Sequence, residues 1–125
     1  LIEIGSEKYN LIIAIGPSIN GDKYQIKIKD FKDLIINITG ESNIKKSCSI
    51  IESNKENVIP LLKKSTSPDR LLFDIQAAAV IQLYREGITK SQIDLNRLCT
   101  FSNPKLFNSF RRSKTNLRQW SCIYS

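Results

Sequence analysis

The clearest helix in this sequence is DIQAAAVIQLYREG, residues 74–87. The side chains of one face recur at the i, i+3, i+4, i+7 spacing of an amphipathic helix. Such a helix would bury this stripe of side chains against a core. The predicted stripe comprises Ile75, Ala78, Ala79, Gln82 and Leu83. Asp74 is a suitable N-cap, and Gly87 stands where a residue in the left-handed region ends a helix. We therefore predict a helix over residues 74–86.

Short apolar runs on both sides of this helix predict β-strands. The run LIIAI, residues 11–15, ends at Gly16-Pro17 and has the length and β-branching of a strand that is buried on both faces. Residues 24–29 alternate apolar and polar side chains, as in a half-buried strand, and residues 93–99 supply another strand after the helix. Strand, helix and strand in this order indicate the α/β (α+β) class, with mixed β-sheet layers flanked by helices.

Weaker patterns cover the rest of the chain. Apolar residues at helical spacing over residues 30–38 predict a helix that ends at Gly40. The polar stretch 41–68 predicts a loop with one short element at the apolar island 58–62. Residues 107–112 and 119–124 predict two further strands.

The composition is that of one folded domain over residues 1–125, because 41% of the residues are hydrophobic. No apolar run approaches the roughly 20 residues of a membrane span, and residues 1–6 lack the basic segment of a signal peptide. We therefore expect no membrane partner. The chain does not begin with Met and opens directly into apolar sequence, as if a domain were entered partway.

The net charge, the three cysteines and the absence of histidine restrict which classes of function are possible. The formal net charge is +7, but the lysines are scattered without interleaved aromatic residues, which favours a solvated surface over nucleic-acid binding. Three cysteines without a CxxC pair are typical of reduced thiols in a cytoplasmic protein. The absence of histidine excludes Ser-His-Asp and Cys-His catalysis within this chain, and a zinc site would need thiolates and carboxylates alone.

Three local groups could carry chemistry, and each also has a purely structural interpretation. Gly16-Pro17-Ser18 follows a predicted strand, where α/β proteins place ligands, although such a stretch is more often only a turn. Cys99-Thr100 would need a lowered thiol pKa to act as a nucleophile, and a buried small residue is the simpler interpretation. Arg111 and Arg112, adjacent on a predicted strand, would point to opposite faces, so that one of them could bind phosphate or carboxylate in a pocket. The alternative is two surface arginines.

The order and spacing of these groups resemble the laccase-domain family, also called the YfiH-like or multicopper polyphenol oxidoreductase family. The family's "CT…FFSYRR" signature is similar to Leu98-Cys99-Thr100 followed by residues 106–112. Its strand-end "IGPSI" and a later Tyr resemble residues 15–19 and Tyr24. Its "DL…A…QL…G" helix resembles residues 73–87, and its closing "GR" strand is similar to residues 118–120. The matches keep their order over nearly the whole chain.

The resemblance implies a laccase-domain (cytotoxic-necrotizing-factor-like) fold and a zinc-dependent purine nucleoside phosphorylase-type activity. That activity would cleave adenosine, inosine or methylthioadenosine with phosphate, and adenosine deamination is also attributed to the family. By this resemblance the chain would bind purine nucleoside and phosphate. Arg111 or Arg112 would meet the phosphate or the developing negative charge, and Ser18 and the Gly16 backbone would line the mouth of the pocket.

Some positions depart from the family pattern. Asn108 stands where the family usually has a second Phe, and Leu117 stands where it has a Gly. The family's zinc ligands resemble a His/Cys/His set from an "ADC" and an "HAGWRG" stretch, and neither stretch is present in this sequence. The resemblance therefore implies that residues 1–125 are the C-terminal portion of a single laccase-like domain, whose missing N-terminal half would be a partner holding the zinc. Two alternatives stay open: a degenerate, non-catalytic relative that acts as a binding module, and a basic nucleic-acid-binding domain.

Overall fold

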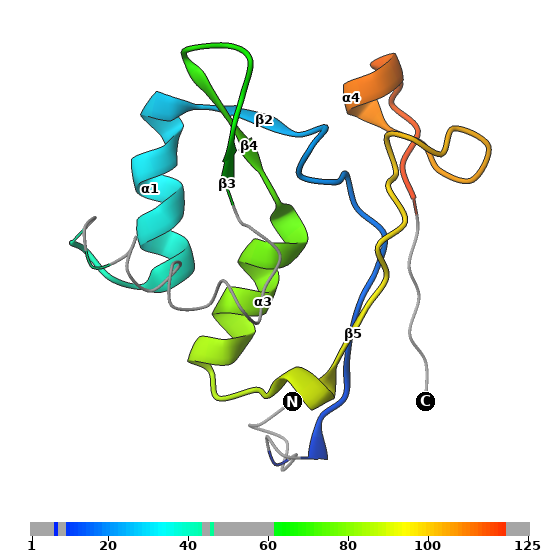
Figure 1. The fold of residues 1–125 in the computed structure, drawn as a ribbon. Helices are drawn as coiled ribbons and strands as arrows, with labels where there is room; N and C mark the ends of the chain where they lie inside the picture. Colours follow the sequence, from blue (N-terminus) through cyan, green and yellow to red (C-terminus); the bar gives the residue numbers. More distant parts are fainter. Residues whose placement is uncertain (1–6, 8–9, 44–45, 47–61, 120–125) are drawn as a thin grey trace.

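The computed structural model describes residue 7, residues 10–43, residue 46 and residues 62–119 (Figure 1). The strands in chain order are β1 (Ile13–Ile15), β2 (Gln25–Lys27), β3 (Leu62–Lys64), β4 (Arg70–Phe73) and β5 (Ile93–Leu95). The helices are α1 (Ile28–Thr39), α3 (Ile75–Arg85) and α4 (Phe110–Ser113), and Lys90–Gln92 forms one 3₁₀ turn, η3. No helix of the described residues is long and apolar enough to cross a membrane.

Two small sheets organise these elements. β2, β4 and β3 form an antiparallel three-stranded sheet in the order β2-β4-β3, whereas β1 pairs with β5 in parallel. Figure 1 shows α1 beside the three-stranded sheet and α3 below it, with the segments that contain β1 and β5 running past α3 on the side away from α1. Parallel and antiparallel pairing with flanking helices confirms the predicted α/β (α+β) class.

The hydrophobic core lies between α1, α3 and the three-stranded sheet. Its buried members are Ile26, Ile38, Phe73, Ala77, Ala78 and Ile81. Tyr24, Phe31, Leu34 and Leu71 pack against this cluster from the partly exposed rim. Residues from α1, α3, β2 and β4 therefore bury their apolar surface in one place. Such burial is the main stabilising term of a small domain.

Helix α1 confirms the prediction for residues 30–38 and extends it by two residues at its start and one at its end. Gly40 ends the helix with a φ of 66°, and its N–H donates to the Ile36 carbonyl. A side chain at Gly40 would be strained in this left-handed conformation, so the glycine is the stop signal that the sequence indicated. Arg85 of α3 then donates from Nη1 to the Ile38 carbonyl at 2.8 Å and satisfies one of the free carbonyls of the last turn.

Helix α3 confirms the predicted helix and its caps. The Asp74 side chain accepts a hydrogen bond from the Ala77 N–H at 2.9 Å, and Gly87 follows the helix with a φ of 83°. The predicted buried stripe is only partly right, because Ala78 is buried whereas Ile75 and Gln82 are exposed. The buried residues of the helix are Gln76, Ala77, Ala78, Val80 and Ile81. The stripe is displaced because the helix is covered on two sides, by α1 with the three-stranded sheet and by the β1 and β5 segments, so that even Gln76 is buried.

Strand β1 exists where it was predicted, but the expectation that it is buried on both faces is wrong. Ala14 is exposed, and Ile12, just before the strand, keeps 86% of its surface exposed. The alternating exposure of β1 shows that no described residue covers the face that carries Ala14. The strand predicted for residues 93–99 is β5 followed by an isolated parallel bridge between Ser18 and Cys99.

The strand predicted for residues 107–112 is also wrong. Residues 107–109 are irregular and α4 begins at Phe110, with Ser109 in extended conformation before it. The half-buried strand predicted over residues 24–29 ends at Lys27, because α1 begins at Ile28. Most of the island predicted at residues 58–62 and of the strand predicted at residues 119–124 lies outside the described residues. The hairpin of β3 and β4 was not predicted, because its strands are only three and four residues long.

Candidate functional site

The loop that follows β1 is fixed by a buried polar network. Gln76 of α3 donates from Nε2 to the Gly16 carbonyl at 2.8 Å and to the Asn96 carbonyl at 2.6 Å. Arg97 donates to the Gln76 Oε1 at 2.7 Å and pairs with Asp74 at 3.0 Å. The network ties the ends of β1 and β5 to the start of α3, so that the loop has a defined position.

Within this loop, Gly16 has open space beside its backbone and Ser18 has a weakly engaged hydroxyl. A Cβ atom built on Gly16 would meet nothing within 4 Å, so the backbone at this position faces open space. The Ser18 hydroxyl makes only a long contact of 3.4 Å to the neighbouring Ile19 carbonyl, whereas the Ser18 carbonyl accepts from the Thr100 N–H at 3.0 Å. The Ser18 backbone is therefore structural, and its hydroxyl is weakly engaged.

The thiol of Cys99 lies beneath this loop as a buried hydrogen-bond acceptor. The Asn20 N–H donates to the Cys99 Sγ at 3.4 Å. Burial raises the pKa of the Cys99 thiol, but the hydrogen bonds from the Ser102 side chain and from the backbone of Asn20, Ser102 and Phe101 outweigh it and hold the pKa below 9.0. Because the side chain is buried, the thiol joins two loops in this structure and faces no open surface.

The Arg112 side chain has a structural role. Its Nη1 donates to the carbonyls of Thr100 and Phe101, both at 2.8 Å, and its Nη2 donates to the Phe107 carbonyl at 2.7 Å. One guanidinium thus satisfies three backbone acceptors and fastens α4 to the loop before it.

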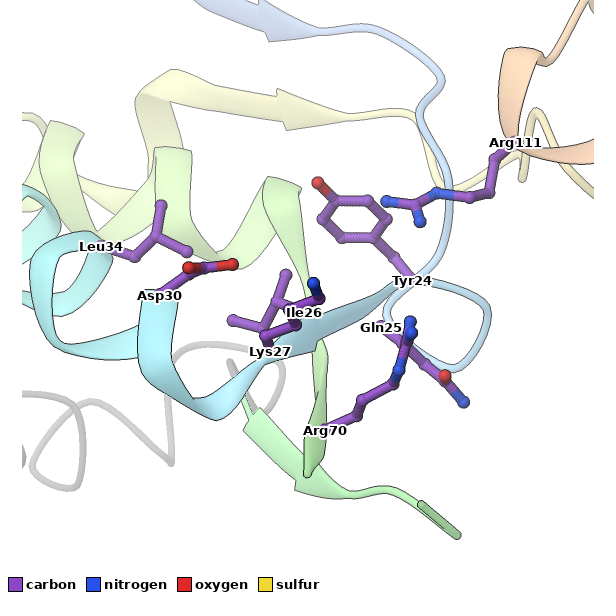
Figure 2. A pocket seen from close by; sticks show the side chains of 8 residues that line it. All are labelled: Tyr24, Gln25, Ile26, Lys27, Asp30, Leu34, Arg70 and Arg111. Carbon is purple, nitrogen blue, oxygen red and sulfur yellow. The ribbon is translucent and has the colours of Figure 1, made fainter. Parts of the chain in front are cut away.

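Arg111 has the opposite environment. Its guanidinium carbon lies 4.8 Å from the centroid of the Tyr24 ring, and its exposed side chain reaches a cavity of about 290 Å³ between β2, α1, β4 and α4. Figure 2 shows Arg111 extending from α4 across Tyr24, while Arg70 of β4 extends toward Gln25 and Tyr24. The prediction that the two arginines point to opposite faces of a strand is wrong, because they are consecutive residues of a helical turn. Their side chains leave this turn about 100° apart.

Sequence reasoning missed Arg70 and Gln76. Arg70 has no local motif, and it enters the cavity only because β4 pairs with β2. Gln76 was placed in a helix, but nothing in the sequence marks a glutamine that bridges two loop carbonyls. Arg111 lies at the cavity, whereas Gly16 and Ser18 lie at the separate loop after β1, so the structure does not bring all the predicted residues into one pocket.

A family model described as "Multi-copper polyphenol oxidoreductase laccase" matches residues 2–125. The chain belongs to this family. The resemblance inferred from the motifs is therefore confirmed, and it covers almost every residue of the chain.

Two individual relatives agree with this assignment. The chain is 27% identical over 124 residues to a purine nucleoside phosphorylase of Synechocystis sp., an alignment that covers 99% of this chain and 47% of that relative. The fold matches the crystal structure of YlmD from Geobacillus stearothermophilus with a TM-score of 0.53 and 24% identity, over 81% of this chain and 31% of that one. The chain thus spans about half the length of the phosphorylase that it matches.

The described residues do not fit a zinc site. No group of three or more His, Cys, Asp or Glu side chains in the described ranges could hold a metal ion, and the sequence contains no histidine. Cys99 is surrounded by hydrogen-bond donors, which stabilise a thiolate without a metal. We therefore assign no chemical step to a metal on these residues.

Proposed function

We propose that this chain supplies the substrate-side part of a purine nucleoside phosphorylase-type site. The reaction would join a phosphate oxygen to C1′ of the ribose and break the bond from C1′ to the purine nitrogen, which leaves with a proton. Inosine, adenosine and methylthioadenosine are the proposed nucleosides. The Synechocystis relative, a purine nucleoside phosphorylase aligned over 99% of this chain, supports the reaction class.

The observation that carries the proposal is the environment of Arg111. Its side chain makes no ion pair and no hydrogen bond with the described residues, yet it is held over Tyr24 at the entrance of a cavity. A positioned guanidinium without a carboxylate partner can bind a phosphate through charge-assisted hydrogen bonds. Arg112 is not available to a phosphate in this way, because its guanidinium already donates to three backbone carbonyls. Ser18 and the Gly16 backbone stay in the proposal as groups that would contact the nucleoside from the separate loop after β1.

The zinc expected from the resemblance stays a prediction about the complete protein. The described residues offer no ligand set, so the metal would require ligands from other parts of the protein. The same observation keeps the non-catalytic binding module as a second candidate. Elemental analysis of the purified full-length protein separates the two, since stoichiometric zinc contradicts the binding-module alternative.

The proposal is tested by incubating the full-length protein with inosine, with and without phosphate, and measuring hypoxanthine and ribose 1-phosphate. We expect phosphate-dependent formation of both products. Arg111→Ala should lower kcat/KM at least ~10-fold, which corresponds to about 1.4 kcal/mol of lost transition-state stabilisation. Lys105→Ala removes the same charge from an exposed position outside the cavity and should change little. Cleavage that does not depend on phosphate, or no cleavage at all, would contradict the proposal.

A further inference from the structure

The cavity beside Arg111 contains more positive charge than its own carboxylate can neutralise. Lys27 and Arg70 line it together with Arg111, and Asp30 is its one acidic lining residue. Asp30 lies in the first turn of α1, where its charge interacts favourably with the positive end of that helix. The lining therefore carries a net charge of +2, from three cations and one anion.

Two of these cations are placed against each other by the register of the sheet. Lys27 of β2 and Arg70 of β4 are direct partners in the antiparallel pair, so their side chains emerge on the same face. Like charges at directly opposite positions destabilise a sheet. An anion between or beside them would offset that repulsion.

The positive groups have no acidic partner in the described part of the chain. The ion pairs found there join Lys23 to Asp22 and Arg97 to Asp74, and neither lines the cavity. Arg70 is half-buried and makes no side-chain hydrogen bond with the described residues. A guanidinium that solvent reaches and that no carboxylate neutralises can donate charge-assisted hydrogen bonds to an anion.

The floor of the cavity is apolar and fixed. Ile26 is buried in the core, Leu34 packs against the core from α1, and Tyr24 lies between the arginines in Figure 2. Arg111 is positioned by its contact with the Tyr24 ring. The volume of about 290 Å³ exceeds that of an orthophosphate ion and leaves room for a sugar beside it.

From these contacts we propose that the cavity is the phosphate-binding subsite, in which Arg70 and Arg111 share the phosphate dianion and Lys27 adds positive charge at the rim. The assignment of orthophosphate as the cosubstrate rests on the proposed function, whereas the existence of an anion site rests on the cavity alone. Arg70 is the new substrate-binding residue, and it comes from a strand that no motif marks.

Direct binding tests the subsite without any reference to activity. Inorganic phosphate is titrated into the full-length protein by isothermal titration calorimetry at constant ionic strength, with chloride as the background anion. We expect saturable binding that Arg70→Gln and Arg111→Gln each weaken at least ~10-fold. Lys105→Gln, which removes one exposed charge outside the cavity, should bind as the wild type does. Arg70→Lys, which keeps the charge but not the fork of donors, should recover part of the loss.

Each result decides one question. Arg70→Gln that binds phosphate as tightly as the wild type, while its thermal unfolding is unchanged, overturns the subsite. The absence of phosphate binding by the wild-type protein overturns it too. Arg70-dependent phosphate binding without inosine cleavage upholds the anion site and contradicts the proposed reaction. Phosphorolysis in which Arg70→Gln leaves the KM for phosphate unchanged upholds the reaction and contradicts this subsite.

Discussion

Two regions of the molecule are held together by different forces. The region built from α1, α3 and the three-stranded sheet surrounds one cluster of buried apolar side chains. The segment from residue 96 to residue 119, which contains α4, leaves most of its large apolar side chains exposed. These exposed residues are Leu98, Leu106, Phe110 and Leu117.

Polar contacts to the backbone replace a core in the second region. Arg112 donates to three carbonyls, and the Asn103 side chain donates to the Cys99 carbonyl at 2.8 Å. Arg97 connects the segment to α3 through Gln76 and Asp74. Stability in the first region therefore depends on buried area, and in the second on a few side chains with several hydrogen bonds each. The cavity with Arg70 and Arg111 lies where the two regions meet (Figure 2).

The largest contrast should appear when one apolar side chain is shortened in each region. Ile81 is 2% exposed in the core, so Ile81→Ala should lower the free energy of unfolding by about 2–5 kcal/mol. Leu106 is 67% exposed, and Leu106→Ala should change it by less than about 0.5 kcal/mol. Urea denaturation followed by circular dichroism measures both. Equal losses in the two variants would contradict the contrast between the regions.

A smaller effect is expected where the regions are joined. The Asp74 side chain is 5% exposed and pairs with Arg97 at 3.0 Å, so Asp74→Asn leaves a partly buried guanidinium without its counter-charge. We expect a loss of about 1–3 kcal/mol in the free energy of unfolding. Asp22→Asn is the matched control, because Asp22 is 57% exposed and lies 3.8 Å from Lys23, a surface pair of little value. If Asp22→Asn lowers the free energy of unfolding as much as Asp74→Asn does, the Asp74–Arg97 pair contributes no more to stability than a surface ion pair.

The smallest effect concerns the titration of Cys99. In a Cys48→Ser, Cys122→Ser background, the thiolate absorbance should rise with a midpoint below pH 9.0, and Ser102→Ala should raise that midpoint by removing a donor. Because the folded pKa lies below the unfolded one, the thiolate stabilises the fold above the unfolded pKa. That contribution is lost as the pH falls through the folded pKa. A midpoint at or above 9.0 in the folded protein would contradict the hydrogen-bonding account of this thiol.

The first region was largely predictable because periodicity and caps specify it. The spacing of apolar residues predicted α1 and α3, and Gly40, Asp74 and Gly87 marked their ends correctly. The buried face of α3 was not predictable, because a helix covered on two sides has no single stripe. β3 and β4 were missed because their strands are too short to show an alternating pattern.

The second region was not predictable from local pattern, because its structure depends on long-range polar contacts. The residues before and in α4 have the composition of a strand, yet they form a turn in which Arg112 binds the carbonyls of residues 100, 101 and 107. Arg111 was found through the family motif. Arg70 reaches the cavity through the pairing of β4 with β2, and a sequence read along the chain gives no sign of that pairing.

The proposed roles, phosphate binding for Arg111 and stabilisation of the fold for Arg112, are tested by comparing two variants of the full-length protein. Arg112→Gln leaves three carbonyls without their donor and should lower the free energy of unfolding by about 1–3 kcal/mol. Arg111→Gln should leave the unfolding midpoint unchanged and lower kcat/KM for phosphate at least ~10-fold. The proposed roles are contradicted if Arg111→Gln destabilises the protein as much as Arg112→Gln, or if Arg111→Gln retains the wild-type kcat/KM for phosphate.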